Sequence, residues 1–409
     1  MAGRFQAPKG TFDVLPDESA RRARIHTAAA ELFARAGYGR IETPVFEDTE
    51  LFERGVGAST DIVSKEMFTF EDLGGRSITL RPEATASICR AYVEHGMHKL
   101  PQPVKVWWWG PAFRYEAPQA GRFRQFNQID VEAIGSDSPL VDAEQVIMLD
   151  ELLRGLGIEG IRLRLSSLGT AESRAEYREE LKTYLRAHES DLSTEVRGRI
   201  DANPMRAFDA DDDGTRAVMA QAPRMLDRLA EADAEHFAEV RRHLDGAGVE
   251  YELDGTLVRG LDYYTRTVFE FESDRLGAQS ALGGGGRYDG LVAELGGPEA
   301  PGCGWAAGIE RILLALPADG DEPGADVFVV AEDGQRGRAL ALAVELRRAG
   351  IAAGLDLANR SVKGQMKQAN RTGAGLAVIL EQDGGAQVRD MESGDQRSVD
   401  PGKLSEEIT

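Results

Sequence analysis

Apolar and polar residues alternate along this chain in two ways, at helical spacing and at strand spacing. Gly37 ends the first helical stretch, and Pro44 interrupts the strand that follows it. The patterns predict, in order, a helix over 18–37, a broken strand over 40–48, a hairpin and a helix within 67–95, a helix over 139–156 and a strand over 161–169. The helix within 67–95 is expected to begin near Pro82 with Glu83 in its first turn, because both residue types are common at helix starts.

A second hairpin, over residues 113–132, carries the densest group of candidate functional residues. The chain turns at Pro118–Gly121 and then returns as a strand. Because successive side chains of a strand point to opposite faces, one face of this return strand carries Phe126, Gln128, Asp130 and Glu132. Three arginines accompany that face: Arg114, Arg122 and Arg124. This set suits a ligand with a polyphosphate, a flat base and a cationic amine, and the alternative is a polar strand face in contact with solvent.

The rest of the chain predicts a helical insertion and a second domain. Residues 171–248 are largely helical in pattern and acidic. Residues 325–409 predict a separate α/β domain, with buried strands at 326–330 and 375–380 and a helix at 337–350. The expected fold class is therefore α+β with a C-terminal α/β domain.

The charge of the chain is strongly acidic. Asp and Glu number 69 against 48 Lys and Arg, and only 8 of those 48 are lysines. An acidic surface usually argues against nucleic-acid binding. The interpretation we favour is a protein adapted to a high-salt cytoplasm, where repulsion between carboxylates is screened. GC-rich coding would also enrich arginine over lysine, and the sequence leaves that open.

Cysteine use and hydropathy indicate a cytoplasmic protein with no membrane segment. Cys89 and Cys303 form no disulfide or metal pattern. The N-terminal residues lack an apolar signal core, and no run of about 18 apolar residues is present. No metal site is predicted either. The Asp-rich stretch at 209–214 resembles the start of a calcium loop, but Ala220 stands where a bidentate glutamate is required.

Five ordered segments resemble the histidyl-tRNA synthetase family. FRYE…GRFRQF and GWAAGIERI look like motifs 2 and 3 of class II aminoacyl-tRNA synthetases. KGTFDVLP, LVRGLDYYTRTVFE and LGGGGRYDGLV resemble histidyl-tRNA synthetases specifically, and TLRPEATA also fits. The resemblance implies a class II antiparallel-sheet catalytic domain over 1–324, with the helical insertion, and an anticodon-binding domain over 325–409. It also implies a homodimer.

The resemblance implies activation of L-histidine by ATP, with Mg²⁺ on the phosphates, and transfer of histidine to the terminal adenosine of histidine tRNA. Arg114 would hold the α-phosphate and Arg122 the outer phosphates. Phe126 and Arg311 would sandwich the adenine, and Glu116 would contact its amino edge. Arginine suits these roles because its planar fork matches phosphate and stacks on flat rings. Arg259 would be the catalytic arginine, together with Arg114.

The same resemblance assigns the amino-acid site. Glu83, Thr85 and Gln128 would hold the ammonium of histidine, and Glu132 and Tyr264 would meet the two imidazole nitrogens. Tyr263 is either a further histidine-binding residue or a core aromatic.

The chain departs from the family pattern at a few positions. Ala117 and Ala120 stand where basic residues are common, and Ala84 stands where glycine is usual. Asp130 replaces a small residue and adds a carboxylate near the ligand.

One stretch of the C-terminal domain is basic. No acidic residue lies between Asp356 and Glu381. Within that gap, cationic residues recur at helical spacing and are predicted to face tRNA phosphates: Arg360, Lys363, Lys367 and Arg371.

Three alternatives remain beside the synthetase. The first is a regulatory subunit of histidine biosynthesis, which resembles the catalytic domain but usually lacks the LVRGLDYYT-type segment. The second is a non-catalytic histidine or tRNA sensor. The third is a class II enzyme for another amino acid.

Overall fold

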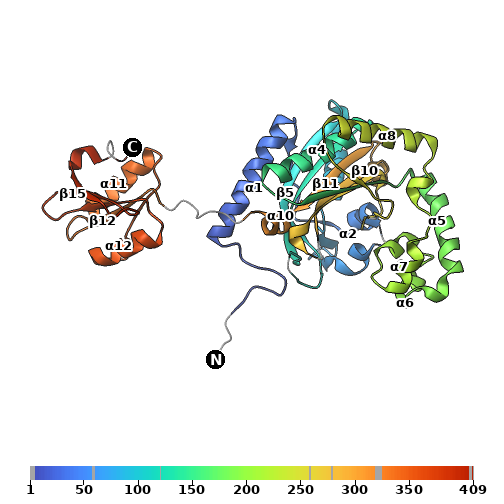
Figure 1. The fold of residues 1–409 in the computed structure, drawn as a ribbon, viewed down its shortest axis with the longest axis horizontal. Helices are drawn as coiled ribbons and strands as arrows, with labels where there is room; N and C mark the ends of the chain where they lie inside the picture. The colour runs from blue at the N-terminus through green and yellow to red at the C-terminus, as the bar shows by residue number, and fades with distance from the viewer. Residues whose placement is uncertain are drawn as a thin grey trace. The chain divides into compact units, whose positions relative to one another are not determined.

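The computed structural model describes residues 5–57, 60–119, 121–257, 259–277, 280–317, 325–404 and 408. The chain divides into two compact units, Met1–Pro317 and Ala318–Thr409 (Figure 1). The domain boundary expected at 324/325 falls beside residues 318–324, which lie outside the described part. In the described ranges no helix is long and apolar enough to span a bilayer.

The first unit is built on an eight-stranded sheet in the order β1-β5-β6-β11-β10-β9-β7-β8. Neighbouring strands are antiparallel except at the two edges, where β1 runs parallel to β5 and β8 runs parallel to β7. The strands are β1 (Gly39–Arg40), β5 (Val104–Phe113), β6 (Gln125–Ile134), β7 (Ile161–Ser167), β8 (Glu252–Leu253), β9 (Thr265–Ser273), β10 (Ala281–Tyr288) and β11 (Gly302–Gly308). This arrangement confirms the α+β class with an antiparallel catalytic sheet.

A smaller antiparallel sheet of three strands, in the order β2-β4-β3, completes the strands of this unit among the described residues. Its strands are β2 (Phe46–Asp48), β3 (Phe68–Glu71) and β4 (Ser77–Leu80). The predicted interruption at Pro44 is confirmed, because β1 ends before it and β2 begins after it in a different sheet. The hairpin predicted within 67–95 is also confirmed; it turns at Gly74 and Gly75, and Gly75 adopts a positive φ of 76°.

Helices cover one face of the large sheet. Apolar residues of α1, α4 and α8 pack with those of β6, β7, β9, β10 and β11 into one core (Figure 1). The helices of this unit are α1 (Pro16–Arg35), α2 (Thr49–Phe52), α3 (Thr85–Glu94), α4 (Pro139–Gly155), α5 (Ala171–Ala187), α6 (Thr194–Arg199), α7 (Asp213–Met219), α8 (Glu231–Gly246), α9 (Leu291–Glu294) and α10 (Ile309–Ala315). Helices α5–α8 follow β7 and precede β8, where the sequence predicts a helical insertion.

The start of α3 differs from the prediction. The helix begins at Thr85, and Glu83 lies before it. The carboxylate of Glu83 accepts hydrogen bonds from the backbone N–H groups of Thr85 (2.8 Å) and Ala86 (2.9 Å). The first amides of a helix lack partners within the helix. Glu83 therefore precedes the first turn and satisfies two of these amides with its side chain, as a capping residue does.

The second unit is an α/β domain on a five-stranded sheet in the order β13-β12-β14-β15-β16. Its elements are β12 (Val327–Ala331), α11 (Arg336–Arg348), β13 (Ala353–Leu355), α12 (Val362–Arg371), β14 (Leu376–Leu380), β15 (Ala386–Asp390) and β16 (Gln396–Val399). The strands β13, β12 and β14 are parallel, and β15 and β16 continue antiparallel. The predicted strands and helix of this domain are confirmed.

Candidate active site

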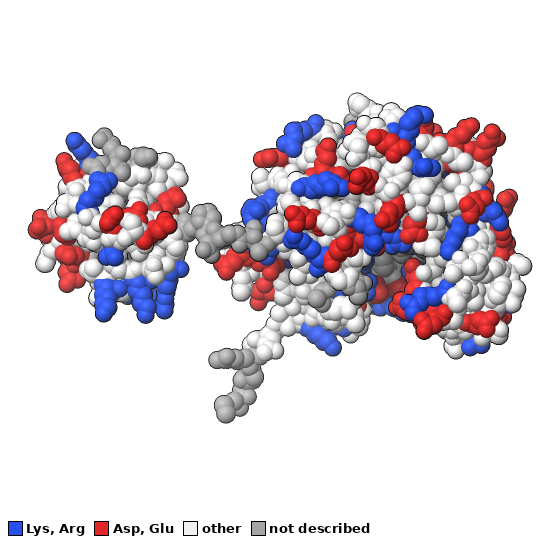
Figure 2. All heavy atoms as spheres, in the orientation of Figure 1, with Lys and Arg blue, Asp and Glu red and all other residues white. Residues whose placement is uncertain are grey.

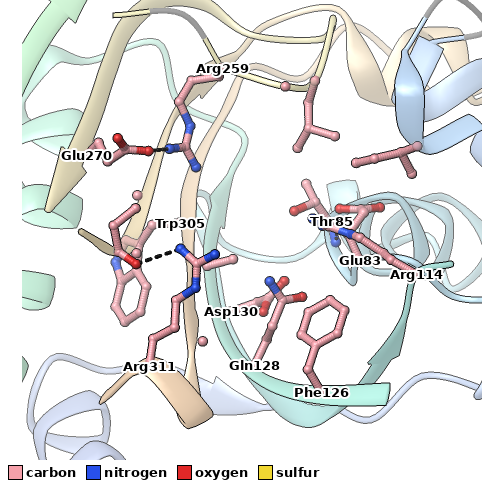
Figure 3. Close-up of a pocket in the computed structure, with 18 of the residues that line it drawn as sticks. Glu83, Thr85, Arg114, Phe126, Gln128, Asp130, Arg259, Glu270, Trp305 and Arg311 are labelled. Atoms are coloured by element: carbon pink, nitrogen blue, oxygen red, sulfur yellow. Dashed lines mark hydrogen bonds and ion pairs between the residues drawn. The ribbon is translucent and has the colours of Figure 1, made fainter. Parts of the chain in front are cut away.

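A cavity of about 380 Å³ lies on the face of the large sheet opposite α1 and α4 (Figure 3). Every second residue of β6 lines it, namely Phe126, Gln128, Asp130 and Glu132. The intervening Ile129, Val131 and Ala133 are fully buried in the core on the other face. The predicted alternation along this strand is therefore confirmed, and the polar face is a cavity wall.

Glycine makes room for these side chains on the neighbouring strands. Gly304 of β11 pairs with Glu132, and a Cβ atom at Gly304 would lie 1.8 Å from the Glu132 Oε2 atom. On β10, a Cβ at Gly284 would lie 3.1 Å from a guanidinium nitrogen of Arg259. The glycine-rich sequence of these strands thus lets a carboxylate and an arginine lie directly against the backbone.

Five arginines line the cavity, of which four were predicted from the sequence: Arg114, Arg122, Arg259 and Arg311, with Arg206 in addition. Arg259 forms an ion pair with Glu270, which also lines the cavity (Figure 3). Nε of Arg122 lies 3.0 Å from a carboxylate oxygen of Glu116. These two arginines therefore already face carboxylates in the protein without ligand.

The other two predicted arginines are positioned by backbone carbonyls. Arg114 donates from Nε to the Pro82 carbonyl oxygen (3.0 Å), and its guanidinium carbon lies 5.4 Å from the ring centroid of Phe126. Arg311 donates from Nη1 to the Ala281 carbonyl oxygen (2.8 Å). A guanidinium carries five N–H donors, so one hydrogen bond to a carbonyl oxygen orients each of these side chains without using all of its donors.

The position of Arg311 is set by the hydrogen bonds of the preceding residue, Glu310. Glu310 is buried, with 6% of its surface exposed, and it accepts hydrogen bonds from the backbone N–H of Asn127 (3.0 Å) and from Arg22 (2.8 Å). These bonds tie α10 to β6 and to α1. The next residue along α10 is Arg311, which lies across the cavity from Phe126 (Figure 3).

Another part of the cavity is acidic. Three carboxyl side chains line it with 3% or less of their surface exposed: Glu83, Asp130 and Glu132. Glu132 accepts a hydrogen bond from the Thr85 hydroxyl (2.7 Å) and another from the Tyr288 hydroxyl. Thr85 thus connects two carboxyls, since its backbone N–H donates to Glu83.

Burial raises the pKa of all three carboxyls. The pKa of Glu132 rises to about 8, although the hydrogen bonds from Tyr288 and Thr85 lower it in part. The pKa of Asp130 lies well above its usual range because of burial and the nearby Glu132 and Glu83. Burial also raises the pKa of Glu83, whereas its bonds to backbone amides lower it. This end of the cavity therefore holds protons near neutral pH and favours a cationic ligand.

The tyrosines of the LVRGLDYYT segment close this end. Tyr263 and Tyr264 both line the cavity, with 8% and 5% of their surfaces exposed. The Tyr263 ring lies 4.7 Å from that of Tyr264 and 5.8 Å from that of Tyr288, centroid to centroid. Tyr263 is therefore both a cavity residue and part of an aromatic cluster. Val258 of this segment lies outside the described residues, as does Ala120 of the hairpin turn.

A family model described as histidyl-tRNA synthetase matches residues 10–312, and one described as anticodon binding domain matches residues 326–409. The chain is 47% identical to the histidine–tRNA ligase of Rubrobacter xylanophilus, over 97% of both chains. The chain belongs to the histidyl-tRNA synthetase family. It is an aminoacyl-tRNA synthetase with the activity of a histidine–tRNA ligase.

Solved structures agree with this assignment. The apo histidyl-tRNA synthetase of S. aureus shares 37% identity, with a TM-score of 0.82 over 99% of this chain and 100% of that one. The fold alone is also shared, at 23% identity and a TM-score of 0.69, with a Bacillus halodurans C protein described as an ATP phosphoribosyltransferase regulatory subunit/histidyl-tRNA synthetase. That match covers 93% of this chain and 99% of the other. The fold therefore does not separate a synthetase from a regulatory subunit, whereas the full-length identity to ligases does.

Two cavity residues of this synthetase were given no role in the predicted site. Glu270 pairs with Arg259, and Tyr288 holds Glu132. The alternation along β9 would have placed Glu270 on one face, but only the register of β10 on β9, with Gly284 opposite Glu270, brings it beside Arg259. Tyr288 is 156 residues from Glu132 in the chain, and no local pattern joins them.

The anticodon-binding domain carries the basic residues predicted from the sequence. Lys363, Lys367 and Arg371 are exposed on α12, while Gln365 and Ala369 of the same helix are buried. Figure 2 shows Lys and Arg side chains gathered on the side of this unit where Figure 1 places α12.

Arg360 differs from these three. It precedes the helix, whose N-cap is Ser361, and its Nη1 donates to Asp356 (2.6 Å). Asp356 therefore neutralises the charge of Arg360, the first of the four predicted cationic residues.

Proposed function

We propose that the cavity binds ATP along its arginines and L-histidine at its acidic end, so that the carboxylate of histidine meets the α-phosphate between them. The division of charge within one cavity supports this proposal. Four arginines suit the phosphates, and three buried carboxyls suit an ammonium and an imidazole. A polar-faced strand in solvent would not bury its carboxyls.

For ATP, Arg114 takes the α-phosphate, Arg122 the outer phosphates, and Phe126 and Arg311 the two faces of adenine. Glu116 accepts from the adenine amino group. Glu116 and Arg122 face each other without ligand, at 3.0 Å. Binding of ATP therefore has to replace this contact with one to adenine and one to phosphate, which keeps both charges paired.

The first chemical step forms a bond between a histidine carboxylate oxygen and the α-phosphorus and breaks the bond to pyrophosphate. Negative charge gathers on the α-phosphate in the transition state, and Arg259 is the donor proposed to stabilise it. Its ion pair with Glu270 fixes the guanidinium before the substrates arrive. In the second step the terminal adenosine hydroxyl of the tRNA attacks the histidyl carbonyl carbon, and AMP leaves.

For histidine, Glu83, Thr85 and Gln128 hold the ammonium, Glu132 and Tyr264 contact the two imidazole nitrogens, and Tyr263 packs beside them. Glu132 is already held by Thr85 and Tyr288, so its orientation is fixed before histidine binds. A buried polar site of this kind rejects an isostere that leaves these groups unpaired.

Mg²⁺ is proposed to enter with ATP. In the described ranges no group of three or more His, Cys, Asp or Glu residues is arranged to hold a metal. This fits an ion held chiefly by phosphate oxygens and water, as Mg²⁺ commonly is. When bound, it would neutralise phosphate charge.

The basic face of α12, with Arg360 at its start, is proposed to contact phosphates of histidine tRNA. Its local excess of positive charge stands against a net charge of −21 for the whole chain. Attraction to the backbone of the tRNA would therefore be confined to this face and would weaken with salt.

A homodimer is proposed to form through the small sheet. Side chains at and beside β2 and β3 leave an unusual amount of apolar surface exposed: Val45 (41%), Phe46 (53%), Phe70 (48%) and Leu73 (111%). Exposed apolar side chains gathered on one small element are typical of an interface. Light scattering should give the mass of a dimer for the protein and of a monomer for a Phe46→Glu, Phe70→Glu variant, and a monomeric wild type would contradict the proposal.

A salt-rich cytoplasm is proposed as the working environment, on the acidic, lysine-poor composition. The experiment that tests specificity and this proposal together is pyrophosphate exchange into ATP with each of the twenty amino acids, in low salt and in molar potassium chloride. Exchange with histidine alone, and faster in molar salt, is expected. Exchange with another amino acid would overturn the imidazole assignment, and no exchange from folded protein would favour a regulatory or sensing role. Faster exchange in low salt would contradict salt adaptation alone.

A further inference from the structure

One of the three carboxyls at the acidic end has no partner. Asp130 is fully buried, and neither of its carboxyl oxygens has a hydrogen-bond partner within 3.5 Å among the described residues, although the Ala84 amide lies near enough to lower its pKa. Figure 3 shows its side chain beside that of Gln128, both directed from β6 into the cavity. A buried carboxyl without a partner is costly, so its position indicates a partner that the protein itself does not supply.

The neighbouring carboxyls are satisfied by the protein. Glu83 accepts from two backbone amides, and Glu132 accepts from the hydroxyls of Thr85 and Tyr288. The side-chain oxygen of Gln128, however, is also buried without a hydrogen-bond partner in the described structure. Two unpartnered acceptors, two residues apart on one strand, therefore face the same part of the cavity.

The two arginines whose charge acts on Asp130 direct their hydrogen bonds to backbone carbonyl oxygens instead. Arg81 donates to the carbonyl oxygens of Thr43 (2.8 Å) and Pro111 (2.8 Å). Arg114 donates to the Pro82 carbonyl and stacks over Phe126. A small ligand cation is therefore the remaining candidate, and an ammonium group offers three N–H donors of the kind that these acceptors lack.

We infer that Asp130 is a further histidine-binding residue, which accepts a hydrogen bond from the α-ammonium beside Gln128 and selects for ligands that carry this group. The inference deepens the histidine-binding role proposed above and rests on it. This role would give a function to Asp130, which stands where a small residue is expected in the family.

Binding of the ammonium beside Asp130 should also release a proton from its carboxyl. Burial raises the pKa of Asp130, Glu132 and Glu83 raise it further, and the Ala84 amide and Arg114 lower it. The more distant Arg81 also attracts the ionised form. The raised pKa favours the protonated form of this carboxyl before the ligand binds. An ammonium beside it favours the ionised form, so its proton passes to the buffer as histidine binds.

The test compares histidine with 3-(imidazol-4-yl)propionate, which keeps the imidazole and the carboxylate but lacks the ammonium. Calorimetry of the wild type and of Asp130→Asn in two buffers of different ionisation enthalpy, near pH 7, counts the protons released with each ligand, and comparing the two proteins cancels the protons that the ligand's own imidazole carries. The wild type should release more protons than the variant with histidine, and the two proteins should release equal numbers with the analogue. Equal proton release by the two proteins with histidine would overturn the inference.

Asp130→Asn keeps the shape of the side chain and removes its charge. It should weaken histidine binding about 10- to 100-fold, as expected for loss of a charge-assisted hydrogen bond. Binding of the analogue and the KM for ATP should stay within about twofold. Asp150→Asn is the matched control, because Asp150 is buried and paired with Arg154 in α4, away from the cavity, and it should leave both ligands unaffected.

Each outcome has a distinct meaning. An equal loss for histidine and the analogue would show that Asp130 only maintains the shape of the site, and no loss for either would show that it faces no ligand. Both results overturn the inference while leaving histidine-dependent exchange by the wild type intact. Absence of that exchange would instead remove the proposed function on which the inference rests.

Discussion

Replacement of Glu132 by glutamine should remove a large part of the pH dependence of folding. The side chain is 1% exposed, and burial raises its pKa from an ordinary value of 4.5 to about 8. Between these two values the unfolded chain has lost the proton that the folded protein still holds. The stabilisation is therefore complete below about pH 4.5 and is lost as the pH rises through about 8.

The size of the effect follows from the same shift. At 1.36 kcal/mol per pKa unit, it corresponds to at most about 5 kcal/mol across the window. Neighbouring carboxyls titrate in the same range, so a part of this value is expected in practice. Glutamine keeps the volume of the side chain, and its amide can still bond with the hydroxyls of Thr85 and Tyr288, but it does not titrate.

Urea unfolding of the wild type and of Glu132→Gln at half-unit steps from pH 5 to pH 9 measures the difference. The variant should gain stability relative to the wild type as the pH rises, and it should lose histidine-dependent exchange because the amide no longer matches the imidazole. Glu94→Gln is the control, since the side chain of Glu94 is 59% exposed and lies on the surface of α3. Parallel stability profiles for wild type and Glu132→Gln across the window would refute the reasoning.

Three further changes test other parts of the site. Arg259→Ala should slow adenylate formation in single-turnover experiments by roughly two to four powers of ten with ATP affinity nearly intact, and an equal loss of ATP affinity would count against a transition-state role. Gly304→Ala places a Cβ atom 1.8 Å from Glu132 Oε2, so the KM for histidine should rise about tenfold or more with little change for ATP, and an unchanged value would contradict the close packing. Lys363→Glu with Lys367→Glu should weaken tRNA binding about tenfold or more at moderate salt, leave pyrophosphate exchange unchanged, and differ little from wild type near molar salt. Unchanged tRNA affinity at moderate salt would exclude this face.

Strand alternation predicted the cavity wall because the period of a strand is rigid. Once Ile129 and Val131 are assigned to the core, Gln128 and Asp130 have to face the other way. The strands β12 and β14 were predictable from a different pattern, because a continuous apolar run requires burial on both faces of a sheet.

Contacts between distant segments were not predictable in this way. Whether Glu270 meets Arg259 depends on the register of β10 on β9 and on the loop that carries Arg259, and the sequence pattern of β9 alone does not determine either. The start of α3 was not predictable because a glutamate at this position can either join the first turn of a helix or accept hydrogen bonds from the first helix amides. The two arrangements favour the same residue types, and Glu83 adopts the second. Arg360 has helical spacing with Lys363, yet Ser361 caps the helix after it.

The two ends of the cavity keep their buried charges neutral by different means before substrates bind. Two of the arginines do so with ion pairs, the largely buried Arg259 with Glu270 and the more exposed Arg122 with Glu116. The carboxyls do so by raised pKa values, at Asp130 and Glu132. On the proposed assignment, binding of ATP would exchange ion pairs, and arginine keeps its charge at any pH the fold tolerates. Binding of histidine would exchange protons, so we expect a change of pH near neutrality to act chiefly on the affinity for histidine and to leave the protein's own contribution to ATP affinity nearly constant.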